Sequence, residues 1–161
     1  MAAKSLLLEP AIIILDNNPD CAARINNVVF AVLGVKATIF TDKDPVLRWC
    51  AEHPVHADMV IAWEGDIHFN GFKLLKELDG IFLRPVFAVF LFNPSVNEAS
   101  TEAWFYSLDK VFKTIIPFKA IRYPYRLSKL GTALNDAFSW YKPDTGSSVT
   151  IAGNRNQKDD K

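Results

Sequence analysis

The sequence has few cysteines and no long apolar run, and each shortage excludes a class of protein. Its 161 residues include two cysteines, Cys21 and Cys50, which fall in expected helices and form no CxxC pair, so we expect reduced thiols and no disulfide. No run approaches the roughly 20 apolar residues that span a bilayer. Residues 1–10 also lack the long apolar core of a secretory signal. We therefore expect no membrane contact and a cytoplasmic location.

Net charge and chemical motifs are also missing. The 18 basic and 18 acidic residues cancel, and no Lys/Arg stripe stands out, so the domain is predicted not to bind nucleic acid directly. His53 and His56 have no third ligand at metal spacing. A nucleophile elbow is absent, and no glycine follows the first strand to cradle a phosphate. No metal, cofactor or catalytic residue is predicted.

What the sequence does contain is an alternation of apolar runs and helical periodicities. Continuous apolar runs at 11–15, 58–63 and 85–92 favour strands that are buried on both faces. Shorter strands are expected at 35–40 and 120–123. Helical spacing with capping residues predicts helices in the intervals, from about Pro19 to Gly34 and at 46–52, 72–78 and 100–111. The last helix carries one apolar stripe, made of Leu127, Leu130, Leu134, Ala137, Phe138 and Tyr141.

Five strands that alternate with five helices predict an α/β fold. The expected architecture is a flavodoxin-like (βα)5 doubly wound sandwich, in which a five-stranded parallel sheet carries helices on both faces. We place this domain at residues 10–141, after an N-terminal extension at 1–9. Residues 142–161 are rich in Gly, Ser, Asp, Asn and Lys, which predicts a polar tail or linker without order of its own.

The segment after the third run carries a family resemblance. Residues 58–71 read DMVIAWEGDIHFNG, which is similar to the third strand and loop of response-regulator receiver domains: an acidic residue, an apolar strand, the phospho-accepting position and a closing glycine, here Gly71. The family's acidic pair falls on Asp16 and Asn17. Its Lys-Pro-aromatic motif, with a bond that is usually cis, falls on Tyr123, Pro124 and Tyr125. The resemblance covers residues 10–141 and implies a two-component signalling domain.

The departures from the family pattern define a degenerate phosphorylation pocket. Trp63 takes the place of the phospho-accepting aspartate, and an indole offers one N–H donor and no nucleophile or metal ligand. Phe90, counted from Pro85, takes the hydroxyl position, and Tyr123 takes the position of the cation. Asn17 replaces one metal-binding acid, which leaves Asp16. The pocket residues are Asp16, Asn17, Trp63, Phe90, Tyr123 and Pro124.

Three of these residues are expected to meet as an aromatic cluster at the carboxyl edge of the sheet. Trp63, Phe90 and Tyr123 could simply fill the former acidic pocket, or they could line a slot for a flat small molecule. For Asp16, the alternative to weak cation binding is a role as a helix cap or turn former. Both alternatives stay open at this point.

A partner surface is expected where receivers commonly present one, on the fourth helix, fifth strand and fifth helix. Trp104, Leu108 and Val111 form the expected core stripe of the fourth helix, which turns Phe105 and Tyr106 outward. Arg122, Tyr125 and Arg126 lie on the same expected face. A protein partner, or a homodimer through this face, is our specific hypothesis, and an effector domain could follow the tail.

The sequence therefore predicts a phosphorylation-independent pseudo-receiver that is not an enzyme and that regulates signal transduction or transcription by binding protein. A small-molecule sensor that uses the aromatic slot is the second hypothesis. A small α/β enzyme is the third hypothesis. It is disfavoured because no set of acid, base and nucleophile converges.

Overall fold

A parallel sheet between two layers of helices forms the domain. The computed structural model describes residues 9–54, 57–66, 69–93 and 102–139. Within them, five strands form one sheet in the order β2-β1-β3-β6-β7, and every pair in it is parallel. The predicted doubly wound α/β fold is confirmed. Apart from Glu9, the predicted extension and the polar tail lie outside the described residues.

The elements follow the predicted order. The strands of the sheet are β1 (Ile12–Leu15), β2 (Thr38–Phe40), β3 (Met59–Trp63), β6 (Val86–Phe92) and β7 (Ile115–Arg122). The helices are α2 (Pro19–Leu33), α3 (Lys43–Glu52), α4 (Gly71–Asp79), α5 (Glu102–Ser107) and α6 (Leu127–Ala137), with a 3-10 turn, η1, at Leu108–Lys110. A hairpin of β4 (Gly65–Asp66) and β5 (Phe69–Asn70) stands where a loop was expected. None of the helices in the described ranges has the length and apolar character needed to cross a membrane.

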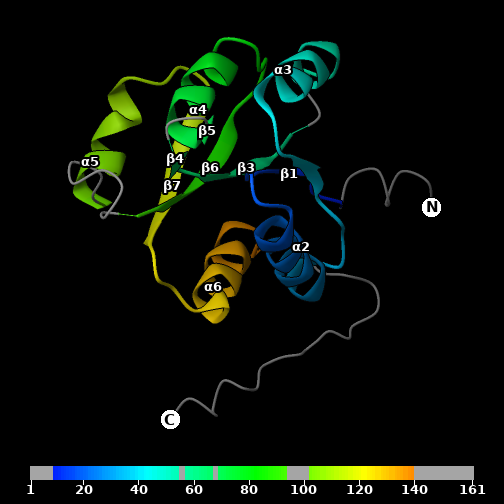
Figure 1. The fold of residues 1–161 in the computed structure, drawn as a ribbon. Coiled ribbons are helices and arrows are strands. Elements are labelled where there is room, and N and C mark those ends of the chain that lie inside the picture. Colours follow the sequence, from blue (N-terminus) through cyan, green and yellow to red (C-terminus); the bar gives the residue numbers. More distant parts are fainter. Residues whose placement is uncertain (1–8, 55–56, 67–68, 94–101, 140–161) are drawn as a thin grey trace.

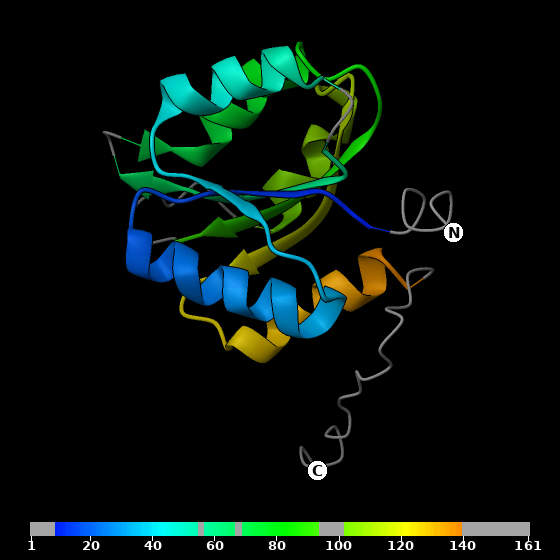
Figure 2. The ribbon, with the colours of Figure 1, turned by 90° about the vertical axis from the view of Figure 1, so that its right-hand side faces the viewer.

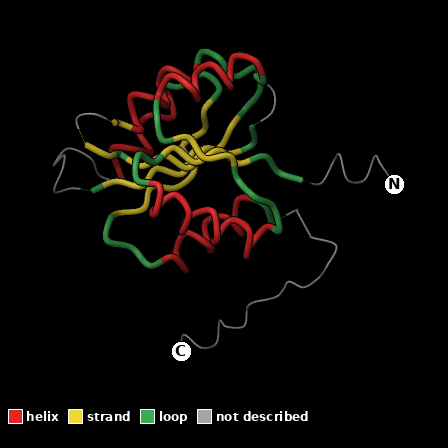
Figure 3. The backbone as a smooth tube through the Cα atoms, turned by 45° about the vertical axis from the view of Figure 1, so that its right-hand side comes forward, coloured by secondary structure: helices red, strands yellow, loops and turns green. Residues whose placement is uncertain are grey.

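The sheet divides the core into two layers, which Figure 3 shows on either side of the strands. Helices α3, α4 and α5 cover one face, which we call the α4 face, and α2 and α6 lie side by side on the other, the α2–α6 face (Figures 1 and 2). Because side chains alternate along a strand, Ala88 and Phe90 of β6 point to the α4 face, while Val89 and Leu91 point to the α2–α6 face.

Helix α2 begins and ends where its sequence predicts. The side chain of Asn18 accepts hydrogen bonds from the backbone N–H groups of Asp20 and Cys21, and Pro19 takes the first helical position. Gly34 closes the helix with a φ of 75° and donates its N–H to the carbonyl of Phe30. Both cysteines, Cys21 and Cys50, are free thiols, as predicted.

The fourth predicted helix is shorter than expected and has a different buried stripe. Its α-helical part ends at Ser107 and a 3-10 turn follows. Phe105, Leu108 and Phe112 are buried, whereas Val111 is 57% exposed. The prediction that Val111 belongs to the core is therefore wrong, because the tighter turn after Ser107 brings Phe112 inward instead. The side chain of Trp104 lies outside the described residues.

Strand β7 starts well before the predicted 120–123. Its pairing with β6 shifts by one residue, since Ala88 pairs with Pro117 but Val89 pairs with Lys119. Phe118 is thus the extra residue of a bulge. Pro117 has no N–H to donate and is tolerated because β7 is an edge strand. These two features broke the apolar pattern on which the strand prediction relied.

The last helix keeps most of its predicted stripe. Leu130, Leu134, Ala137 and Phe138 are buried against the sheet, as predicted. Leu127, the first residue of the helix, is instead 41% exposed. Tyr141 falls outside the described residues.

Candidate functional site

The predicted pocket residues gather at the carboxyl edge of the sheet, where the strands of a parallel sheet end together. Asp16 follows β1, Trp63 is the last residue of β3, and Tyr123 and Pro124 follow β7. The peptide bond between Tyr123 and Pro124 is cis, as the family resemblance implies. The fold thus places five of the six predicted pocket residues along one edge, because Asn17 also lies there, next to Asp16.

Trp63 and Tyr123 contact each other across this edge. Their ring centroids lie 5.8 Å apart in an edge-to-face arrangement, with an interplanar angle of 66°. Tyr125 meets Tyr123 in the same way, at 6.4 Å. Trp63 is half-buried and packs on the α2–α6 face, whereas Tyr123 is 48% exposed. The three rings form a partly open aromatic rim.

Phe90 does not join this rim, so the predicted cluster of Trp63, Phe90 and Tyr123 is wrong in one member. In the sheet, Trp63 pairs with Leu91 and Phe90 pairs with Ala62. Because neighbouring residues of a strand point to opposite faces, Phe90 is fully buried on the α4 face. Leu91, and not Phe90, is the β6 residue beside Trp63 on the α2–α6 face.

Phe105 packs against Phe90 in the core. Their rings stack with centroids 5.3 Å apart and an interplanar angle of 12°, and Phe105 is fully buried. The prediction that Phe105 belongs to a partner surface is therefore wrong, because α5 turns this residue toward the sheet. The side chain of Tyr106 lies outside the described residues.

Asp16 acts as a turn former. Its side chain is buried, and Oδ1 accepts a hydrogen bond of 2.9 Å from the backbone N–H of Asn18, which in turn caps α2. Burial raises the pKa of the Asp16 carboxyl above its ordinary value, and the single backbone hydrogen bond lowers it by less. Asn17 is exposed. The turn-forming alternative for Asp16 is the one that the contacts support.

Glu64 is a second buried carboxylate of this edge, in addition to Asp16. Its backbone N–H donates to the carbonyl of Leu91 at 2.9 Å, and its Oε1 accepts from the backbone N–H of Asn93 at 3.1 Å. Glu64 therefore ties the loop after β3 to the loop after β6. Across the part of the chain that the structure describes, no three His, Cys, Asp or Glu side chains gather closely enough to hold a metal ion.

Gly71, the closing glycine of the 58–71 segment, is required by close packing and not by its φ. A Cβ on Gly71 would lie 2.2 Å from the carbonyl oxygen of Trp63. Its N–H donates to the carbonyl of Glu64 at 3.2 Å. Helix α4 can begin this close to the end of β3 only because residue 71 has no side chain.

A small hollow of about 260 Å³ opens beside the edge, at the loops after β1 and β2. Its lining is largely polar and consists of Asn17, Pro19, Thr41, Asp42, Lys43 and Phe69. None of the three predicted aromatic residues lines it. Asn17 is the one member of the predicted pocket that also lines this hollow.

Comparison with known proteins agrees with this geometry. No family model and no curated protein matches the sequence, but solved structures match the fold. A response regulator receiver domain protein from Clostridium thermocellum superposes with a TM-score of 0.63 at 18% identity, over 81% of this chain and 95% of that chain. A response regulator from Colwellia psychrerythraea gives a TM-score of 0.62 at 12% identity, over 79% and 94% of the two chains.

The chain has the receiver fold. A structure described as adenylate cyclase from Rhodopirellula baltica matches to the same degree, with a TM-score of 0.63 at 12% identity over 83% of this chain and 90% of that chain. Structural likeness at these identities establishes the architecture of the domain, and its chemistry has to be argued from its own residues.

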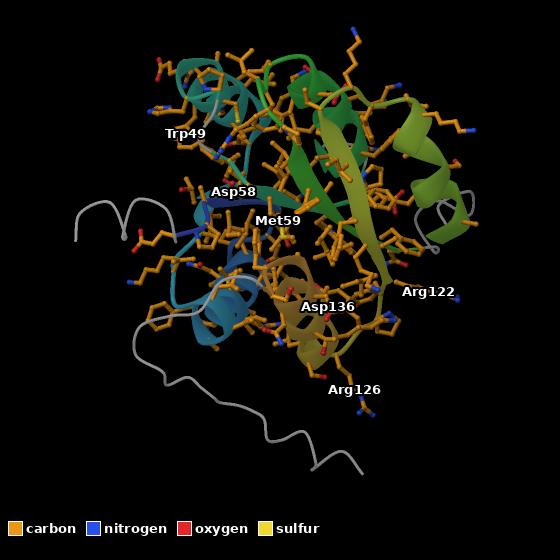
Figure 4. The ribbon with its side chains drawn as sticks, turned by 180° about the vertical axis from the view of Figure 1, so that it is seen from behind. Trp49, Asp58, Met59, Arg122, Arg126 and Asp136 are labelled. Carbon is orange, nitrogen blue, oxygen red and sulfur yellow. The ribbon has the colours of Figure 1, made fainter. Side chains whose placement is uncertain are left out.

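On this receiver fold, the remaining predicted surface residues lie at the end of β7 and the start of α6. Arg122 and Arg126 are exposed and point away from the domain (Figure 4). Tyr125 is half-buried between them. Burial, reinforced by the negative charge of Asp16, raises the pKa of Tyr125 to about 12. The Tyr125 phenol therefore stays neutral at physiological pH.

Proposed function

We propose that this chain is a phosphorylation-independent receiver-like module that regulates signal transduction or transcription by binding a protein partner. The observation that carries the proposal is the position of Trp63, the last residue of β3, where the family resemblance implies the phospho-accepting aspartate. An indole ring can neither attack phosphorus nor ligate Mg²⁺. The module would therefore act through partner occupancy and not through catalysis.

The neighbours of Trp63 support the same proposal. Tyr123 stands in the cation position of the family motif and packs its ring against Trp63. Asn17 carries no charge, and burial opposes ionisation of Asp16. Each of these features removes part of the charge that would hold a metal ion and a phosphoryl group.

The partner surface that we propose lies on the α5–β7–α6 side and includes Arg122, Tyr125 and Arg126. Tyr106 belongs to this hypothesis from its sequence position alone. The two occupants predicted for this face are a protein partner and a homodimer. An effector domain after the polar tail is a further prediction, and the cytoplasm is the compartment we expect. Recognition would rest on exposed arginines beside aromatic rings, which are enriched at protein interfaces.

Intact-mass measurement after incubation with acetyl phosphate and Mg²⁺ tests the loss of phosphorylation. We expect no phosphoryl adduct on the wild type. We also expect none on Trp63→Asp, because Phe90 and Tyr123 still stand where the family resemblance implies a hydroxyl and a cation. A receiver domain with an intact phospho-accepting aspartate, treated in parallel, is the positive control. A stable phosphoryl adduct on the wild type would overturn the proposal.

The small-molecule hypothesis receives less support. It needs a slot lined by Trp63, Phe90 and Tyr123, but Phe90 is on the opposite face of the sheet. The hollow beside the edge is lined by other side chains. No observation in the described residues favours a flat aromatic ligand.

A further inference from the structure

The zero net charge of the chain hides a strong local asymmetry. Residues 110–135 contain six lysine and arginine residues and neither aspartate nor glutamate. The rest of the chain consequently carries twelve basic and eighteen acidic residues. The neutrality of the whole chain therefore does not extend to this segment, in which apolar residues separate the basic ones.

The fold collects most of this charge along one edge. Four of the basic residues follow the second half of β7 and the first turn of α6, and we call them the basic edge: Lys119, Arg122, Arg126 and Lys129. All but the half-buried Lys119 are exposed. Figure 4 shows Arg122 and Arg126 extending into solvent on the same side, across the domain from Asp58. The ion pairs of the described residues, Lys43 with Glu77 and Arg84 with Asp58, lie elsewhere.

Apolar surface lies within the basic edge. Tyr123, next to Arg122, is 48% exposed, and Leu127, next to Arg126, is 41% exposed. Arginine beside exposed aromatic and aliphatic side chains is the composition typical of the centre of a protein interface.

We propose that the basic edge, together with Tyr123 and Leu127, docks an acidic segment of another protein that carries an apolar or aromatic anchor. This inference rests on the proposed function and names the chemistry of its partner. The carboxylates of the segment would pair with Arg122 and Arg126, whose planar guanidinium groups match carboxylate geometry. The anchor would cover Tyr123 and Leu127.

Charge argues against a second copy of the chain as the occupant. A two-fold dimer brings the same patch of both copies together, so the basic edge would face another basic edge. Like charges at an interface disfavour association. Nucleic acid is also disfavoured, since the rest of the chain is acidic and a phosphate backbone does not bury Leu127.

Fluorescence anisotropy with defined probes tests the proposal. The main probe is a labelled Glu-rich peptide with one central Phe, and the comparison probes are the same peptide with Gln for Glu, the same peptide with Ser for Phe, and single-stranded DNA of equal charge. The test variant is Arg122→Glu with Arg126→Glu. Its matched control is Lys36→Glu with Arg48→Glu, which reverses two exposed cations on the β2 side of the domain.

We expect the wild type to bind the main probe more tightly than each comparison probe, and more weakly as salt is added. The Arg122/Arg126 variant should lose at least about tenfold in affinity, while the Lys36/Arg48 variant keeps it. Amide chemical-shift changes in the wild type should centre on residues 119–131. Circular dichroism of all variants checks that each one is folded.

Four results would overturn this inference: no binding of the main probe to the wild type, an equal loss in the control variant, equal or tighter binding of DNA, or a wild-type dimer that Arg122→Glu with Arg126→Glu dissociates. The last result would make a second copy the occupant. These outcomes are independent of the acetyl phosphate test. A phosphoryl adduct there would overturn the proposed function, whereas failure of the peptide to bind would leave it standing.

Discussion

The two ends of the parallel sheet use carboxylates in opposite ways. At the amino end, Asp58 and Asp79 accept several hydrogen bonds each and hold strands in place. At the carboxyl end, the buried carboxylates are Asp16, which accepts a hydrogen bond from the backbone N–H of Asn18, and Glu64, which accepts one from the backbone N–H of Asn93. The comparison separates carboxylates that stabilise the fold, such as Asp79, from Asp16, whose burial opposes its negative charge.

Asp79 is the clearest structural carboxylate. It sits at the end of α4 and accepts hydrogen bonds from the backbone N–H groups of Lys113, Thr114 and Ile115 and from the Thr114 hydroxyl. Burial alone would raise the pKa of Asp79, but these hydrogen bonds together lower it. Asp16, with burial as the larger effect, has a raised pKa instead. At neutral pH one charge therefore stabilises the domain and the other destabilises it.

The largest expected effect is at the amino end, from Asp79→Asn. The amide would leave backbone N–H groups at the start of β7 without their charged acceptor, so the free energy of unfolding at neutral pH should fall by about 2–3 kcal/mol. Because the folded pKa is lowered, the stability from Asp79 is present above the ordinary carboxyl pKa and lost as pH falls. Urea denaturation of both proteins should thus give curves that converge in acid; a constant gap would contradict this account.

The next effect is at the carboxyl end, from Gly71→Ala. The new Cβ would lie 2.2 Å from the Trp63 carbonyl oxygen, so backbone must move, at an expected cost of about 2 kcal/mol in the free energy of unfolding. Gly80→Ala is the matched control, because a Cβ there meets no atom within 4 Å. Thermal unfolding of the two variants should differ clearly. Equal melting temperatures would mean that α4 does not pack against β3 as described.

Asp58→Asn should have a smaller effect. Asp58 accepts a hydrogen bond from the backbone N–H of Ala11 at 2.8 Å, which the amide oxygen can still accept, and its Oδ1 pairs with Arg84 at 3.1 Å. Since both partners of this ion pair are partly exposed, its loss should cost about 0.5–1 kcal/mol at low salt. Denaturation at high salt should reduce the difference. A loss as large as that of Asp79→Asn would break the proposed ranking.

Asp16→Asn should give the smallest change, with the opposite sign. The amide keeps an oxygen for the Asn18 N–H and removes a buried charge, so the free energy of unfolding at neutral pH should rise by about 0.5 kcal/mol. Because the folded pKa of Asp16 is raised, the wild type should regain this stability as pH falls and Asp16 takes up a proton. Denaturation across that pH range measures the convergence. A destabilised Asp16→Asn at neutral pH would make Asp16 a structural carboxylate like Asp79.

The central elements of the fold were predictable from the sequence because they are uniformly apolar. β1, β3 and β6 matched their predicted runs to within a residue at each end. The edge strand β7 was only half predicted, since Pro117 and the bulge at Phe118 interrupt its pattern. The buried stripe of a short helix is equally hard to predict. The change to a 3-10 turn at Leu108 places Phe112 in the core in place of Val111.

The site was predictable where a residue's place follows from the end of its own strand. Asp16, Trp63 and Tyr123 were placed in this way. Phe90 was misplaced because its face depends on the register between β3 and β6, which one strand's sequence does not contain. Asp79 was missed because its partners lie 34 to 36 residues further along the chain.

The bulge and Pro117 in β7 also bear on the tendency of this domain to aggregate. An open edge strand offers a template on which other chains can add as strands, the first step of aggregation. A proline without an N–H, an interrupted register and the charge of Lys119 all oppose such addition. These features favour contact of the proposed partner with the side chains of β7 over the addition of a strand to the sheet.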